Sequence, residues 1–140
     1  MIPTKTYKVL GIEHIGIAMR TNDEIKYFLD LLPGLSYIGS ELVLDQKVDT
    51  HIYQTKDSKI ELLNSTEENS IIDRFLKKNR NKIHHIALKV DNISNAIKEL
   101  KNAGIDFIND EPSIGAENCK IAFVHPKSTG GILFELCQHS

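Results

Sequence analysis

Two histidines and two glutamates occupy matching places in the two halves of this chain. His14 and His85 each lie in an apolar run typical of a strand, and Glu61 and Glu135 each lie in a later apolar run. Burying an unpaired carboxylate costs several kcal/mol, so a positive group should sit against each glutamate. We expect no Lys or Arg at an equivalent inward position, whereas an imidazole arrives from the first run of each half. The pattern therefore predicts one divalent cation bound by all four side chains.

This donor set is typical of a catalytic metal site. Two neutral imidazoles and two carboxylates leave coordination positions open for water or substrate oxygens, unlike a closed structural site. The donors suit Co²⁺, Mn²⁺, Ni²⁺ or Mg²⁺, with Zn²⁺ as a further candidate. A lone strand histidine is usually structural, so the prediction depends on the two pairs occurring together. Because strand side chains alternate, we expect His84 to point away from the site and Glu13 to face solvent.

The elements that must position the first pair follow each other as strand, helix and three strands. A strand is expected at about 9–19, and Thr21 with Glu24 three residues later predicts the start of a helix. Apolar residues at i, i+3, i+4 and i+7 give this helix one buried face: Ile25, Phe28, Leu29 and Leu32. Alternating runs then predict three strands, at 35–44, 47–55 and 58–63.

The second half repeats this order. A strand is expected at 83–90, and the next helix, ended by Gly104, carries its apolar residues at the same spacing: Ile93, Ala96, Ile97 and Leu100. Strands are expected at 104–109, 119–125 and 131–138. The chain is therefore predicted to be an α+β protein built from two βαβββ modules, a repeat supported by element order, helix phase and the paired histidines.

We expect one cooperative domain over residues 1–140. It comprises a first module at about 9–63, a connector at 64–81 and a second module at about 82–138. The connector is polar, and Ser70 with Asp73 predicts a capped short helix within it. A connector with this much structure is unlike a flexible linker between independent domains.

The composition favours a small-molecule partner. Of the 140 residues, 41% are hydrophobic and 26% charged, and the net charge of −2 gives no basic surface for nucleic acid or an anionic membrane. Cys119 and Cys137 lack the spacing of a redox or secreted motif and are interpreted as reduced thiols. The first residues lack the apolar core of a signal peptide, and no run reaches the ~20 apolar residues of a membrane span. We therefore expect a cytoplasmic protein.

With these residues in view, the chain resembles the vicinal oxygen chelate superfamily and is most similar to its methylmalonyl-CoA epimerases. The resemblance is carried by short motifs around the four predicted ligands and by a longer C-terminal string: 14–18, 59–63, 84–87, 110–116, 120–131 and 135–137. It implies two paired βαβββ modules forming a cupped mixed sheet around a divalent metal. It also implies ligands at His14, Glu61, His85 and Glu135, an acyl-thioester substrate and a homodimer.

The resemblance further implies proton transfer through a metal-stabilised enolate. A cation lowers the cost of the negative oxygen that develops when the α proton leaves, and a carboxylate moves the proton. Glu135 is the preferred acid/base and Glu61 the second candidate. Some epimerases carry another acid/base Glu where this chain has Thr50, and its neighbours Asp49 and His51 are alternatives. The segment 117–119 also replaces a more glycine-rich run, which puts coenzyme A specificity in doubt.

Three other functions compete with the epimerase. A glyoxalase I, or lactoylglutathione lyase, uses the same ligand types, but the 125–131 turn differs from the turn usual in that family. A non-catalytic small-molecule-binding protein of this superfamily would often lose the ligands, and this chain keeps all four. A ring-cleaving dioxygenase is disfavoured because it needs Fe²⁺ held by two His and one Glu.

Overall fold

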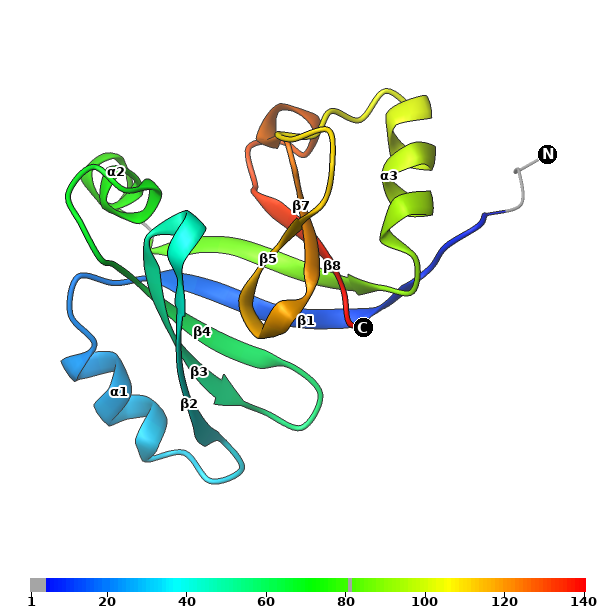
Figure 1. The fold of residues 1–140 in the computed structure, drawn as a ribbon. Coiled ribbons are helices and arrows are strands. Elements are labelled where there is room, and N and C mark those ends of the chain that lie inside the picture. The colour runs from blue at the N-terminus through cyan, green and yellow to red at the C-terminus, as the bar shows by residue number, and fades with distance from the viewer. Residues whose placement is uncertain (1–4, 81) are drawn as a thin grey trace. The chain divides into compact units, whose positions relative to one another are not determined.

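The computed structural model describes residues 5–80 and 82–140. Residues 1–4 and residue 81, the last residue of the predicted connector, lie outside this description. The chain can be followed in Figure 1 by its colour, from blue to red. The elements follow in this order: β1 (Val9–Ala18), α1 (Asp23–Asp30), β2 (Ser36–Val43), β3 (Val48–Gln54), β4 (Lys59–Ser65), α2 (Ile71–Lys78), β5 (Ile83–Val90), α3 (Ile93–Asn102), β6 (Ser113–Ile114), β7 (Lys120–Val124) and β8 (Phe134–Gln138).

The chain forms two compact units. The N-terminal unit is His14–His84, and the C-terminal unit combines Met1–Glu13 with His85–Ser140. Each unit holds a mixed sheet with its helices, so the predicted α+β class and the repeated βαβββ order are confirmed. Among the described residues, no helix has both the length and the apolar character that crossing a bilayer requires.

The sheet of the N-terminal unit has the strand order β2-β3-β4-β1. Strands β2, β3 and β4 are antiparallel neighbours, and β1 runs parallel to β4. Helix α1 packs on one face, where Leu29 meets the fully buried Tyr53 and Leu62. Burying a leucine side chain such as that of Leu29 stabilises the fold by about 1.5–3 kcal/mol.

Helix α2 covers part of the opposite face of this sheet. Ile72 from α2 packs with Ala18 of β1 and Leu63 of β4, which are directly paired in the parallel ladder. The helix begins after Ser70, whose side chain accepts a hydrogen bond from the backbone N–H of Asp73, so the predicted cap is confirmed. Helix α2 therefore packs on the face of the sheet that also carries the first predicted metal pair, His14 and Glu61.

The C-terminal unit repeats this arrangement with the order β5-β8-β7-β6. Strand β5 runs parallel to β8, and β7 pairs antiparallel with both β8 and β6. Helix α3 packs on one face through Ile93, Ala96 and Ile97, which meet Ala122 and Leu136 of the sheet. The other face carries the second predicted pair.

Two local predictions were wrong. Helix α1 begins at Asp23, and its N-cap is Asn22 rather than the predicted Thr21. Asn22 makes no capping hydrogen bond, because its side chain is bonded to Asn64 of β4 instead. Within the described residues, 104–109 form no strand but only an isolated bridge at Phe107, and the short strand β6 lies in the predicted loop. These segments are set by tertiary contacts that local patterns do not record.

Candidate metal centre

The N-terminal unit brings His14 and Glu61 together inside the fold. His14 Nδ1 lies 3.3 Å from Glu61 Oε2, and both side chains are less than a tenth exposed. The parallel register places Gly16 directly opposite Glu61, so the histidine two residues earlier shares a face with the glutamate. The predicted partnership of these two residues is therefore present.

The C-terminal unit contains an equivalent pair. His85 Nε2 lies 3.4 Å from Glu135 Oε1, and both side chains are buried. Ala87 is opposite Glu135, so the histidine again precedes the paired small residue by two positions. The two modules thus repeat the pair at the level of strand register, although His14 presents Nδ1 and His85 presents Nε2.

The donor spacing in each pair fits two ligands of one cation. Two ligand atoms bonded at about 2.1 Å lie about 3.0 Å apart at an octahedral angle and about 3.4 Å apart at a tetrahedral angle. The observed separations of 3.3 and 3.4 Å fall in this range. Each pair can therefore supply two ligands to a divalent metal without a change in its own donor separation.

One electrostatic expectation was wrong. Lys59, which is opposite His14 in the ladder, is 9% exposed and lies two residues before Glu61 on the same face of β4. A cationic side chain therefore does occupy an inward position in the N-terminal unit. The case for a metal there accordingly depends on donor type and spacing, and not on an uncompensated carboxylate.

Thr50, which the sequence resemblance aligns with a further acid/base Glu of some epimerases, lies on the same face as the first pair. Thr50 is 2% exposed and is paired with Leu63, two residues beyond Glu61. Asp49 and His51 alternate to the opposite face, where the Tyr37 hydroxyl lies 3.0 Å from His51 Nδ1 and Asp49 Oδ2 lies 3.1 Å from His51 Nε2. The alternatives Asp49 and His51 are therefore not on the face of His14.

A carboxylate that sequence reasoning missed lies next to Thr50. Glu41 of β2 is directly opposite Thr50 in the antiparallel ladder, and its neighbour on that face, Gly39, has no side chain. Opposite residues on one face have Cβ atoms about 5 Å apart, so the Glu41 side chain leaves the sheet beside that of Thr50. Finding Glu41 from the sequence would have required the register of the hairpin formed by β2 and β3.

The two neighbours of the paired histidines behave differently. The His84 ring packs edge-on against Phe75 of α2, and burial lowers the pKa of this imidazole to about 4, so it is neutral near pH 7. Glu13 was predicted to face solvent, but it is 9% exposed and its carboxylate accepts a hydrogen bond from His139. The prediction failed because side-chain alternation along β1 does not reveal that His139, near the C-terminal end of the chain, lies against Glu13.

The segment that departs from the glycine-rich family pattern has an unusual backbone. Glu117 and Asn118 have φ angles of 57° and 59°, in the left-handed region that favours glycine. Two non-glycine residues thus adopt a conformation that glycine adopts most easily. Cys119 follows this turn and directly precedes β7.

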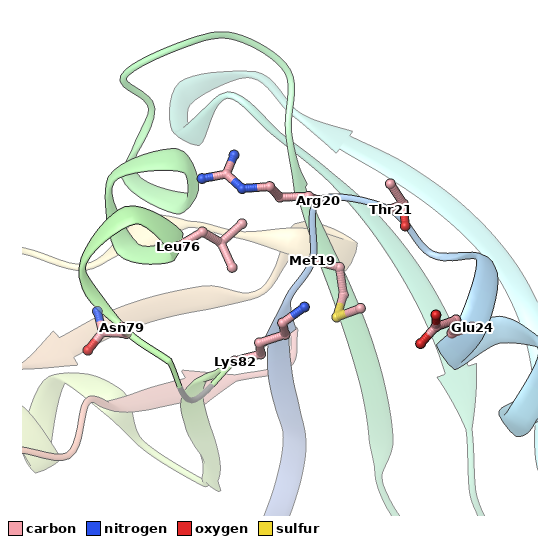
Figure 2. Close-up of a pocket in the computed structure, with 7 residues that line it drawn as sticks. All are labelled: Met19, Arg20, Thr21, Glu24, Leu76, Asn79 and Lys82. Atoms are coloured by element: carbon pink, nitrogen blue, oxygen red, sulfur yellow. The ribbon is translucent and has the colours of Figure 1, made fainter.

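A separate hollow of about 260 Å³ lies in the N-terminal unit (Figure 2). The Lys82 side chain points into it beside Met19, while the Arg20 guanidinium points towards α2, where it binds Asp73 at 3.0 Å. The residues that line it come from the end of β1, the start of α1 and the end of α2: Met19, Arg20, Thr21, Glu24, Leu76, Asn79 and Lys82. None of them is a predicted metal ligand.

Comparison with known proteins identifies the family and fold of the chain. The family model of the glyoxalase/bleomycin resistance protein/dioxygenase superfamily matches residues 13–123. The chain belongs to this superfamily. Its relatives within the superfamily include methylmalonyl-CoA epimerases, among them the mitochondrial enzyme of Mus musculus, which is 32% identical over 133 residues, covering 94% of this chain and 75% of that protein.

Two further superfamily relatives cover most of the chain. The uncharacterized protein YqjC of Bacillus subtilis (strain 168) is 33% identical over 127 residues, or 91% of each protein. The crystal structure of methylmalonyl-CoA epimerase from Mycobacterium tuberculosis is 27% identical and aligns with a TM-score of 0.88, covering 100% of this chain and 93% of that one. The predicted superfamily and its fold are therefore confirmed.

Proposed function

We propose that this protein is a metal-dependent epimerase that acts on methylmalonyl-CoA. The observation that carries the proposal is the repeated His–Glu pair, buried at the same strand register in both units of a chain related to such epimerases. An isomerase that moves the α proton of an acyl thioester needs a cation near the developing enolate and a carboxylate able to exchange a proton.

The proposed ligands of one divalent ion are His14, Glu61, His85 and Glu135. Their neutral imidazoles and carboxylates suit Co²⁺, Mn²⁺, Ni²⁺, Mg²⁺ or Zn²⁺. Such an ion, when bound, supplies positive charge that stabilises the enolate oxygen. The apolar strands around each pair exclude water, which strengthens this electrostatic effect.

The proton transfer is assigned to carboxylates. Glu135 is proposed to remove the α proton, since it is buried in a strand with apolar neighbours and its carboxylate lies 3.4 Å from His85. Glu61 is the proposed partner that returns a proton, because it occupies the equivalent register in the other module. The orientation of both is maintained by the strand ladders on either side.

The assay compares two substrates with Co²⁺-loaded protein. Deuterium from D₂O should enter the α position of methylmalonyl-CoA, and the glutathione hemithioacetal of methylglyoxal should be turned over far more slowly. Preferred turnover of the hemithioacetal would replace the epimerase by the lactoylglutathione lyase, and turnover of neither would favour a non-catalytic binding protein.

A second measurement tests the residue roles. With Co²⁺ added to saturation, Glu135→Gln should lower kcat by at least about 100-fold, the contribution of a positioned acid/base group, with a much smaller change in KM. Activity within a few-fold of the native value would remove Glu135 from the base role. The homodimer, the cytoplasmic location and the single cooperative domain stay predictions, the first of which sedimentation equilibrium would test.

A further inference from the structure

The C-terminal unit contains a thiol, an imidazole and a carboxylate in series. Cys119 Sγ lies 3.5 Å from His139 Nδ1, and His139 Nε2 lies 2.8 Å from Glu13 Oε2. Cys119 is 5% exposed, whereas the His139 side chain is 32% exposed. The three groups come from the start of β7, the residue after β8 and the middle of β1, so the fold assembles them from distant parts of the chain.

The hydrogen bonds fix the role of each nitrogen of His139. A carboxylate can only accept, so His139 Nε2 carries the proton that it donates to Glu13. In a neutral imidazole the other nitrogen then has a free electron pair, and His139 Nδ1 presents this pair to the Cys119 thiol. A nucleophile within hydrogen-bond reach of a base that a third group orients is the arrangement that activates a thiol.

We propose that Cys119 is a reactive thiol that small, soft electrophiles modify covalently, with His139 as its base. In the reaction, Cys119 Sγ forms a bond to the electrophilic carbon. The leaving group departs with the electron pair of its own bond to that carbon, and the thiol proton passes to His139 Nδ1. The reaction needs no metal, although Phe123, which packs against Cys119, also contacts the ring of His85.

The surroundings of Cys119 favour this assignment over an inert buried thiol. Within the described residues it packs against the apolar side chains Ala87, Ile121 and Phe123 and against Cys137. Ionisable groups near Cys119 include His139, with Glu13 behind it, and Cys137, and the thiol also lies 3.9 Å from the backbone carbonyl of Glu117. The Cys137 thiol is directed to the Leu88 carbonyl at 3.7 Å, so this second buried thiol serves as an internal control.

Alkylation by iodoacetamide, followed by peptide mass spectrometry, tests the proposal. An ordinary thiol is about 3% ionised at pH 7, so full ionisation raises the reactive fraction about 30-fold. Full ionisation at pH 7 requires a thiol pKa of about 6, and the lower nucleophilicity of such a thiolate reduces the gain to about threefold. We therefore expect His139→Ala to slow modification of Cys119 about threefold at pH 7 and to leave the rate at Cys137 unchanged.

Two further readouts separate a base from a structural residue. Added imidazole should restore part of the Cys119 rate in His139→Ala, and the pH at which this rate reaches half its maximum should rise towards about 8.5 in that variant. A matched variant, His51→Ala, removes an imidazole from the N-terminal unit and should change neither rate. If the alkylation rates of both cysteines rose equally in His139→Ala, the substitution would have opened the fold. The pH profile of Cys119 in the native protein would then be the deciding measurement for the proposal.

The proposal is overturned by either of two results. One is a native Cys119 that fails to react while both cysteines react in urea. The other is a native half-maximal pH near about 8.5, the value of an unassisted thiol, for Cys119.

Discussion

Replacing Glu135 by Gln should leave the metal-free protein folded but remove most of its stabilisation by metal. Glu135 is 4% exposed, and its carboxylate is buried beside His85 at 3.4 Å. Gln has nearly the same shape and no charge, so the substitution removes a buried charge without creating a cavity. We therefore expect the Tm of the metal-free variant to equal or exceed that of the metal-free native protein.

The expected loss can be worked out from linkage. A ligand at 100 times its Kd stabilises the native state by about 2.7 kcal/mol, and a 100-fold weaker ligand at the same concentration stabilises it by about 0.4 kcal/mol. For a chain of 140 residues, 1 kcal/mol shifts Tm by about 3–4 °C. The metal should thus raise the native Tm by about 8–11 °C and the Glu135→Gln Tm by only about 1–2 °C.

The assay is calorimetry of chelator-treated protein across a Co²⁺ titration, with metal content measured after dialysis. Glu111→Gln is the matched control, because this exposed glutamate lies outside the pairs and its variant should behave as the native protein does. A native-sized rise in Tm with full metal content in Glu135→Gln would show that Glu135 is not a ligand. The reasoning from donor spacing would then be wrong.

Three other predictions concern the N-terminal unit. Glu41→Gln should lower epimerase turnover at least about tenfold with unchanged metal content, because Glu41 is opposite Thr50; unchanged proton exchange would exclude it from the reaction. Bonds from the Asn69 backbone, Arg20 and Lys77 lower the pKa of Asp73 from 3.8 to about 2, so its contribution to stability is present above about pH 4 and is lost as pH falls through about 2. Asp73→Asn should therefore be less stable than the native protein at pH 7, and the difference should shrink during acid unfolding. Leu62→Ala removes a fully buried side chain and should lower the free energy of unfolding in urea by about 2–5 kcal/mol; a loss under about 1 kcal/mol would contradict the packing described for α1.

Short-range patterns accounted for most of the elements and for the residues of both His–Glu pairs. Apolar spacing located α3, and the Ser70 cap located α2, because caps and helix faces depend on residues three or four positions apart. The His–Glu pairs were accessible because strand alternation and a repeated module put equivalent residues at equivalent register. Extended runs such as 104–109 misled the same reasoning, since a strand needs a neighbour to pair with and not only suitable residues.

Residue type and periodicity thus determined by themselves that two modules would each present a histidine and a glutamate. Only the tertiary structure decided which other groups lie beside them. Glu41 reaches Thr50 through the register of a hairpin, and His139 reaches Glu13 across 126 positions of the chain. The physical reason is that helix phase and strand alternation are local properties, whereas the contacts between strands and with the chain termini are chosen by the packing of the whole unit.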